Sequence, residues 1–319
     1  MSAVKIPVRV AEVIDINPLI KRFRFERLDG AMMPAFSGGA HTVVEMDDHG
    51  TRRMNPYSLM GDPADRMGYE ISVRRDDAGR GGSRYMHGHV VPGMAMVISH
   101  PVNLFPLDLR ARKHLMIAGG IGITPFLAQI AQLSAQNARF EMHYAARDAA
   151  HAAYADRLTT RYGDRVQCYF SDLGHRIDLP TLLQGQPLGT HLYVCGPRRM
   201  IAQVRAAAAT AGWPVAAVHS EEFLAPPSGQ PFDVTLAVSG KTITVGEHQS
   251  LLEAIEAVGV DAPYLCRGGA CGQCETDVIA CDGTIQHNDH WLTDDQKASG
   301  SQIMPCVSRF AGKTLVLNR

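Results

Sequence analysis

Residues 266–274 read Cys266-Arg267-Gly268-Gly269-Ala270-Cys271-Gly272-Gln273-Cys274, and a fourth cysteine, Cys306, follows after 31 intervening residues. A C-x4-C-x2-C run with one distant cysteine is the plant-type ligand pattern for a [2Fe-2S] cluster. Glycines between the cysteines let the backbone come close to inorganic sulfide, which a Cβ would obstruct. A structural zinc site is the alternative, but zinc usually recruits two close Cys or His pairs, and only one C-x2-C pair is present. The spacing therefore predicts one-electron transfer through a cluster held by Cys266, Cys271, Cys274 and Cys306.

The bulk composition excludes several other classes. The chain is 45% hydrophobic and 20% charged with a net charge of −1, so it lacks the basic field that attracts nucleic acid. Three cysteines remain beyond the four of the pattern, Cys168, Cys195 and Cys281, and this odd remainder fits a reducing cytoplasm. The first ten residues contain no apolar signal segment. The uncharged stretch 115–133 is interrupted by glycines and a proline, so we expect a cytoplasmic protein without a membrane partner.

The first segment, residues 1–106, carries short alternating runs with little helical periodicity. These runs are Val8–Ile14, Phe23–Arg27, Thr42–Met46, Tyr69–Arg74 and Met94–Ile98. Gly, Pro and Asp clusters separate them, and several short strands at this spacing predict an antiparallel barrel or sandwich.

From residue 107 to 224 the pattern changes to alternating strands and helices, which is typical of a parallel α/β sheet. The expected strands are Leu115–Ala118, Phe140–Ala145, Val166–Phe170 and Leu192–Cys195, and the expected helices are Pro125–Gln136, Ala150–Arg161 and Arg198–Ala211. Residues 225–231 contain three prolines and are interpreted as a stiff linker. Residues 232–319 begin with a hairpin, Phe232–Val238 and Thr242–Val245, followed by a helix, Leu251–Val258, and the cysteine loop.

A glycine-rich loop, Ala118–Phe126, joins an expected strand to an expected helix. Such a loop lets a pyrophosphate approach the backbone at the positive end of the helix. Thr124 is the expected N-cap, and Pro125 suits the first helical turn. Pro125 also stands where the dinucleotide fingerprint has glycine, so a merely tight turn is the alternative. A second loop, Cys195-Gly196-Pro197, opens on the same strand-end face, where α/β sheets bind ligands, and this favours a nucleotide site.

A nicotinamide gives up two electrons together as hydride, whereas a [2Fe-2S] cluster accepts one. A chain that binds both needs a carrier that takes a pair and releases single electrons, and flavin does this chemistry. The N-terminal segment has no other assigned task. It contains Asn55-Pro56-Tyr57-Ser58-Leu59, in which Tyr57 can cover a flat ring and Ser58 can bond its polar edge. A tyrosine in a strand more often only packs against its neighbours, so a purely structural role for Tyr57 is the alternative at this point.

Further along, Arg80-Gly81-Gly82-Ser83 precedes a short helical turn that Ser83 is expected to cap. The N–H groups of this turn, with Arg74 or Arg80, would hold a phosphate. The alternative is a solvated arginine loop.

Taken in this order, the motifs resemble the phthalate dioxygenase reductase family, and the likeness covers essentially all 319 residues. The matching residues are Tyr57–Leu59, Val73–Asp76, Gly79–Ser83, Asn103–Asp108, Ala118–Pro125, Cys195–Pro197, Glu222-Phe223 and the four cysteines. The resemblance implies an FMN-binding antiparallel β-barrel (1–106), an NAD-binding α/β domain (107–224) and, after the linker, a plant-type ferredoxin domain of the α+β β-grasp type (232–319). It also implies NADH oxidation, flavin-to-cluster transfer and single-electron delivery to a terminal Rieske-type oxygenase.

By the same resemblance, Tyr57 and Ser58 contact the flavin ring, and Gly81, Gly82 and Ser83 its phosphate. No side chain is assigned a chemical step, but Ser58, Thr124, Cys195 and Phe223 are expected nearest the reacting rings. The full set of expected cofactor contacts is Asn55, Tyr57, Ser58, Leu59, Arg74, Arg80, Gly81, Gly82, Ser83, Gly119, Gly120, Gly122, Thr124, Asp172, Cys195, Gly196 and Phe223.

One departure from the family concerns its R-x-Y-S flavin motif, whose first position is Asn55 here, with Arg52 and Arg53 just upstream. FMN over FAD therefore rests on the domain order and on the Gly81-Gly82-Ser83 match. NADH is expected over NADPH because no basic cluster for a 2′-phosphate follows the second strand of the nucleotide domain, although Arg147 there leaves NADPH as the alternative. Asp172, after the third strand, is the candidate ribose contact.

The leading hypothesis is an NADH-dependent iron–sulfur flavoprotein reductase for the Rieske oxygenase of an aromatic-degrading or demethylating system. The alternatives are a reductase for a P450 or di-iron monooxygenase, a redox sensor without turnover, and a zinc-stabilised nucleotide-binding module. His287 and His290 are interpreted as surface or loop residues, and the adjacent Glu221 and Glu222 as solvated carboxylates.

Overall fold

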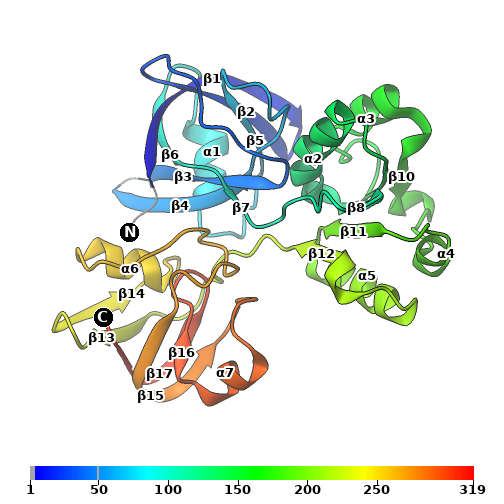
Figure 1. Cartoon of the computed structure of the whole chain (residues 1–319). Helices are drawn as coiled ribbons and strands as arrows, with labels where there is room; N and C mark the ends of the chain where they lie inside the picture. The colour runs from blue at the N-terminus through cyan, green and yellow to red at the C-terminus, as the bar shows by residue number, and fades with distance from the viewer. Residues whose placement is uncertain (1–3, 49) are drawn as a thin grey trace.

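The protein is described by a computed structural model over residues 4–48 and 50–319. Three sheets, one from each predicted segment, meet at the centre of the molecule (Figure 1). The first is antiparallel, the second is parallel, and the third is a mixed sheet with one main helix, as the sequence predicted. Residues 1–3 and 49 of the predicted barrel segment lie outside the described residues.

The N-terminal sheet curls into a half-barrel of the order β4-β3-β6-β1-β2-β5, with β7 paired to β3. Its elements are β1 (Lys5–Asn17), β2 (Ile20–Arg27), β3 (Ala40–Asp48), β4 (Thr51–Ser58), β5 (Tyr69–Arg74), α1 (Gly82–His89), β6 (Ala95–Ser99) and β7 (Val102–Asn103). Alternate residues such as Phe23 and Phe25 point inward and are fully buried. The two ends of the order approach each other, since Met60, just after β4, bridges Glu70 of β5.

The central sheet has the order β10-β9-β8-β11-β12, and all its pairings are parallel. Its strands are β8 (Lys113–Gly119), β9 (Phe140–Ala146), β10 (Val166–Phe170), β11 (Thr190–Cys195) and β12 (Val218–Glu221), and its α-helices are α2 (Thr124–Ala135), α3 (Ala155–Tyr162), α4 (Leu179–Gln184) and α5 (Arg198–Thr210). Short 3-10 turns are η1 (Gly120–Ile123), η2 (Gly163–Arg165), η3 (Ser171–Leu173) and η4 (Val215–Ala217).

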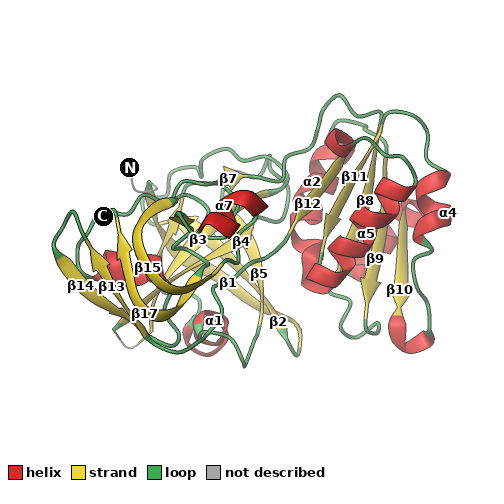
Figure 2. Cartoon of the chain, turned by 90° about the horizontal axis from the view of Figure 1, so that it is seen from below, coloured by secondary structure: helices red, strands yellow, loops and turns green. Residues whose placement is uncertain are grey.

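Helices cover both faces of this sheet (Figure 2). The strand β8 shows why, because Met116 and Ala118 pack with α2 and α3 on one face while Leu115 and Ile117 pack with α4 and α5 on the other. The chain leaves β8 in one direction toward β9 and β10 and later returns on the other side through β11. The loops after β8 and β11 therefore flank the switch point, where such sheets bind ligands.

Two helix starts differ from the sequence prediction. α3 begins at Ala155 and not at Ala150, because the preceding residues form turns and Tyr154 has a φ of 66°. Thr124 is not the N-cap of α2: the 3-10 turn η1 comes first, Ile123 is the cap, and the Thr124 hydroxyl donates to the Ile121 carbonyl at 3.0 Å. The short helix α4 and the strand β12 were not predicted.

The C-terminal sheet has the order β14-β13-β17-β15-β16. Its elements are β13 (Phe232–Leu236), β14 (Lys241–Val245), α6 (Leu251–Ala257), β15 (Thr276–Gln286), α7 (Asp294–Ser299), β16 (Gln302–Ile303) and β17 (Arg309–Leu317). Ser250 and Glu253 form a capping box at the start of α6, which explains why the helix begins at Leu251. Among the described residues, no helix is both long and apolar enough to cross a membrane.

Candidate functional site

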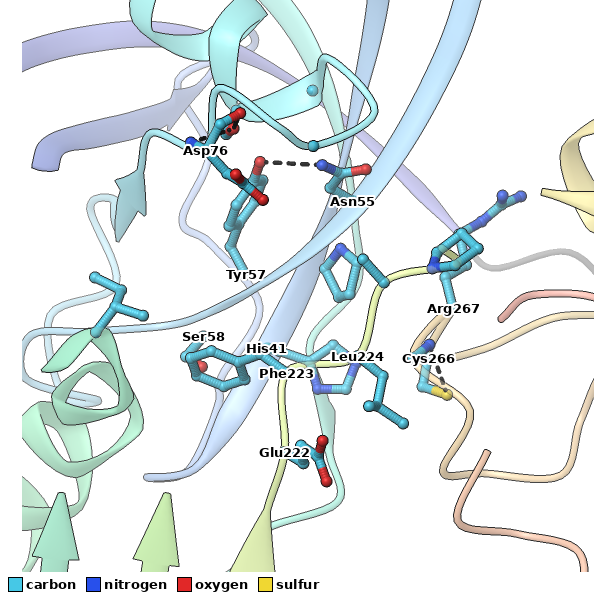
Figure 3. A pocket seen from close by; sticks show the side chains of 18 of the residues that line it. His41, Asn55, Tyr57, Ser58, Asp76, Glu222, Phe223, Leu224, Cys266 and Arg267 are labelled. Atoms are coloured by element: carbon cyan, nitrogen blue, oxygen red, sulfur yellow. Dashed lines mark hydrogen bonds between the residues drawn. The ribbon is translucent and has the colours of Figure 1, made fainter. Parts of the chain in front are cut away.

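A cavity of about 690 Å³ opens where the three sheets meet (Figure 3). One wall comes from β4 and the loop before α1, and a second comes from Ile121, Thr124 and residues 220–228. Cys266–Gly268 and Ala270 of the cysteine loop form a third wall. A ligand in this cavity therefore contacts all three units of the chain at once.

The barrel wall of the cavity includes one face of β4. Arg53, Asn55 and Tyr57 alternate along the strand, so their side chains point the same way, and all three line the cavity. Asn55 Nδ2 donates to the Tyr57 hydroxyl at 3.3 Å (Figure 3), and burial raises the pKa of Tyr57 to about 12. Arg52 points to the opposite face and pairs with Glu45 at 2.6 Å. The family motif has its arginine at the position of Asn55. In this chain the arginine on the same face of the strand is Arg53, two residues before Asn55.

The start of α1 forms the phosphate end of this wall. Gly81 is the N-cap with a φ of 111°, which favours glycine, and a Cβ on Gly82 would lie 2.3 Å from Asn55 Nδ2. Ser83 does not cap the helix as predicted, because its hydroxyl accepts from the Asp76 N–H at 3.0 Å. Free N–H groups at a helix start suit an anion.

The two arginines expected here differ in their surroundings. Arg74 is exposed and lines the cavity. Arg80 also lines it, but its Nη1 is paired with Glu253 of α6 at 2.6 Å, and both side chains are nearly buried. Arg80 therefore ties the barrel to the C-terminal unit.

The two predicted nucleotide loops are packed against each other. A Cβ on Gly122 would lie 2.3 Å from the Cys195 carbonyl oxygen, and a Cβ on Gly119 would lie 2.6 Å from Met200 Sδ. Only glycine allows this approach, so the loops form a single surface at the strand ends. Burial, and then the nearby Glu221 carboxyl, raises the pKa of the Cys195 thiol, which keeps it protonated.

The structure brings most of the predicted cofactor contacts to the cavity wall. The predicted residues that line it are Asn55, Tyr57, Ser58, Arg74, Arg80, Gly81, Gly82, Ser83, Thr124 and Phe223. The other predicted contacts do not line the cavity; they are Leu59, Gly119, Gly120, Gly122, Asp172, Cys195 and Gly196. Leu59 is in the barrel core, and Asp172 lies in the turn η3, where its N–H donates to the Arg147 carbonyl at 3.0 Å.

Among the lining residues that were not predicted as contacts, His41 was missed by the sequence analysis, and Glu221 was wrongly expected to be a solvated carboxylate. Nε2 of His41 and Oε2 of Glu221 are buried and have no hydrogen-bond partner within the described residues. Burial lowers the pKa of His41 to about 4 and raises that of Glu221 to about 8, so both are neutral near pH 7. Nothing in the sequence marks them, because only strand pairing places His41 opposite Ser58 and Glu221 opposite Cys195. Unpaired buried polar atoms are costly, which fits a cavity whose ligand supplies their partners.

The adjacent Glu222 is not a solvated carboxylate either. Its side chain is 13% exposed, and it pairs with Arg198 at 2.7 Å and with His290 at 3.0 Å.

The four predicted cluster cysteines come together as two pairs, Cys266 with Cys271 and Cys274 with Cys306. In each pair a thiol-to-thiol hydrogen bond lowers the pKa of the acceptor, Cys266 or Cys274, and raises that of the donor. The Gly268 N–H also donates to Cys266 Sγ at 3.4 Å. Two thiol pairs suit a cluster of two irons, one pair for each iron, whereas zinc would require all four thiols around one ion. The donor set therefore fits a [2Fe-2S] cluster.

Comparison with known proteins agrees with this geometry. Residues 96–218 match the family model for the dimethylamine monooxygenase subunit DmmA-like N-terminal domain, and residues 234–311 match that for the 2Fe-2S iron-sulfur cluster binding domain. The chain is 45% identical to the heme-dependent oxidative N-demethylase beta subunit of Ectopseudomonas mendocina, over 98% of each chain. It is 38% identical to the phthalate dioxygenase reductase of Burkholderia cepacia, over 92% of each chain. A solved structure of a phthalate dioxygenase reductase, 35% identical, superposes with a TM-score of 0.89 over 99% of this chain and 98% of that chain.

Fold and site together define an electron-transfer reductase with a [2Fe-2S] domain. The chain belongs to the phthalate dioxygenase reductase family. It is an oxidoreductase of the kind that serves as the reductase component of an oxygenase system. The predicted [2Fe-2S] cluster is confirmed by the matched domain, and the solved relative is described as transferring electrons from pyridine nucleotides to [2Fe-2S].

Proposed function

We propose that this chain oxidises NADH and passes single electrons, by way of FMN and the [2Fe-2S] cluster, to a terminal oxygenase. The shared cavity carries the proposal. Its walls include the face of β4 that carries Arg53, Asn55 and Tyr57, which we call the flavin cradle. They also include Thr124 of the nucleotide unit and the predicted cluster ligand Cys266. A cofactor bound there has Ile121 and Thr124 of the first nucleotide loop on one side and the cysteine loop on the other.

FMN supplies the conversion of an electron pair into single electrons, and the chain supplies binding and orientation. Tyr57 offers an aromatic face, and the N–H groups at the start of α1 offer an anion site for the phosphate. We assign the nearby cation to Arg53, which shares the cavity face of β4 with Tyr57 and whose Nε pairs with Asp48 at 3.0 Å. Arg80 is instead paired with Glu253 of the C-terminal unit. His41 and Glu221, with their unpaired polar atoms, are proposed to bond polar edges of the bound rings.

The choice of NADH rests on the turn that follows β10. The Asp172 N–H donates to the Arg147 carbonyl at 3.0 Å, so the two residues are neighbours beyond the ends of β10 and β9. We propose that the Asp172 carboxylate, and not Arg147, meets the ribose. A carboxylate accepts from ribose hydroxyls and repels a phosphate. We expect kcat/KM for NADH to exceed that for NADPH.

The flavin is identified separately. We expect denaturation of the purified protein to release FMN and not FAD.

A pair of cysteine variants tests the electron route. Cys271→Ser removes a predicted cluster ligand, while Cys281→Ser changes an exposed cysteine outside the two pairs. We expect Cys271→Ser to reduce FMN with NADH at a rate within about twofold of wild type while losing delivery to a one-electron protein acceptor by about 100-fold or more. Cys281→Ser is expected to behave as wild type. Delivery that survived in Cys271→Ser would show that electrons leave without the cluster.

The acceptor that the sequence resemblance suggests is a Rieske-type oxygenase, and we propose it as the first candidate. The 45% identical relative is named as a subunit of a heme-dependent demethylase, which makes a heme-containing demethylase the second candidate. The two are separated by mixing the reduced protein with each purified partner and measuring the rate of electron transfer and product formation. Turnover with only the heme partner would exclude the Rieske assignment.

A further inference from the structure

Four polar side chains join the C-terminal unit to the nucleotide unit. We call them the interdomain clamp: Arg198, Glu222, Asn288 and His290. Arg198 is the first residue of α5, and Glu222 directly follows β12. Asn288 and His290 belong to the loop after β15.

Both oxygens of the Glu222 carboxylate are used in the clamp. Arg198 Nε donates to Oε1 at 2.7 Å, and His290 Nε2 lies 3.0 Å from Oε2. Arg198 Nη2 also donates to Asn288 Oδ1 at 3.1 Å, and Asn288 Nδ2 donates to the Ala225 carbonyl at 3.1 Å. The Glu222 side chain is 13% exposed, whereas those of Arg198 and His290 are 66% and 49% exposed, so water and salt reach the contacts from one side. The clamp therefore acts through its hydrogen-bond geometry more than through net charge attraction.

The clamp residues of the nucleotide unit are next to the cavity and the nucleotide loop, and those of the C-terminal unit are next to the cysteine loop. Glu222 precedes Phe223, which lines the cavity, and Arg198 follows the loop Cys195-Gly196-Pro197. On the other side, the His290 N–H donates to the Gly269 carbonyl of the cysteine loop at 3.0 Å. The clamp loop thus packs directly on the loop that carries the cluster ligands.

A second contact holds the opposite side of the C-terminal unit. Arg80 pairs with Glu253 at 2.6 Å, and both Arg80 and Arg53 donate to the His248 carbonyl at 3.3 Å. Because this contact attaches the unit to the barrel, the clamp is not needed for attachment.

We propose that the clamp fixes the position of the cysteine loop relative to the flavin cradle, and that Glu222 is a positioning residue for flavin-to-cluster electron transfer. The inference rests on the proposed electron route. Small interdomain contacts leave relative motion as the default, and a displacement of about 1 Å can cost a reaction about 100-fold. Loss of the clamp is therefore expected to slow the transfer step. Because Glu222 and His290 also line the cavity, the FMN dissociation constant is measured for every variant, and it is expected to stay within about twofold of wild type.

The test uses variants on the C-terminal side of the clamp, Asn288→Ala, His290→Ala and the two combined, with His175→Ala as a matched surface histidine. Anaerobic stopped-flow mixing with NADH follows flavin and cluster absorbance separately. The combined variant is expected to reduce its cluster about tenfold more slowly or worse, with flavin reduction within about twofold of wild type. Combining Glu222→Gln with His290→Ala should slow the transfer by less than the product of the two single effects, because both variants remove the Glu222–His290 contact.

Two further readouts separate positioning from damage. Limited proteolysis within residues 225–231, which does not depend on activity, is expected to be about threefold faster in the combined variant, because local opening exposes the linker. The midpoint potential of the cluster is expected to stay that of wild type. Cluster reduction within twofold of wild type in the combined variant would overturn the proposal, and so would a potential shift large enough to explain the slowing. If NADH failed to reduce the cluster even in wild type, the proposed function would fail instead, so the two failures are distinguishable.

Discussion

Burial sets the protonation state of the residues around the cavity. Glu221 is the clearest case, since its carboxyl lies at the end of β12 with one oxygen buried and unpaired. Removal from water disfavours the charged form, which is why the pKa of Glu221 rises to about 8. The same cause keeps the Cys195 thiol and the His41 imidazole uncharged. A ring bound in this cavity therefore meets neutral polar groups on the side of β12.

The raised pKa of Glu221 predicts a pH-dependent stability. Its contribution is fully present below the unfolded pKa of about 4.5 and is lost as pH rises through about 8, because folding then holds an ionised carboxyl out of water. Glu221→Gln stays neutral throughout. We expect the Tm of Glu221→Gln relative to wild type to rise by about 2–4 °C between pH 5 and pH 8.5 in the cofactor-loaded protein. The control is Glu247→Gln at an exposed carboxylate, and parallel Tm curves for Glu221→Gln and wild type would contradict the assignment.

At the scale of elements, the alternation of strand β4 decides which arginine reaches the cavity. Arg53 shares a face with Asn55 and Tyr57, whereas Arg52 points to the other face and pairs with Glu45. The sequence shows two adjacent arginines and does not say which one is used. The strand register answers that question.

This alternation predicts different roles for two neighbouring arginines in FMN binding. Arg53→Ala is expected to weaken FMN binding by about tenfold or more, because a charge-assisted contact is lost. Arg52→Ala removes the same charge from the opposite face and is expected to stay within about twofold of wild type. Fluorescence titration of the flavin-free protein measures both dissociation constants. Equal losses in the two variants would mean that only the net charge matters.

Strands and helices with a clear local pattern of apolar and polar residues were predictable from the sequence. Features that depend on contacts with other segments of the chain were not. The strands β5 and β10 were predicted to the residue, because short segments rich in strand-forming residues, with alternation of apolar and polar side chains in β5, lie between turn residues. Thr124 was expected to cap α2, but a 3-10 turn, which the sequence does not signal, precedes the helix. Ser83 was also expected to be a cap, and its hydroxyl instead bonds Asp76 across the loop.

At the scale of the whole molecule, the cysteine spacing predicted the cluster and the order of motifs predicted three sheets. The arrangement of the three sheets around a shared cavity could not be predicted, since it depends on contacts between residues far apart in the sequence. Glu222 illustrates this: it was expected to be solvated, yet it joins Arg198 to His290 in the interdomain clamp. The position of a charged residue between domains is set by packing and not by its own sequence neighbours.

The central claim is that electrons from NADH reach a [2Fe-2S] cluster held by the four paired cysteines. The most direct measurement is the EPR spectrum of the purified, cofactor-loaded protein after anaerobic addition of NADH. We predict the signal of a reduced [2Fe-2S] cluster at about one spin per chain, since plant-type clusters accept a single electron. NADH oxidation without any such signal, in protein that contains iron and acid-labile sulfide, would contradict the account.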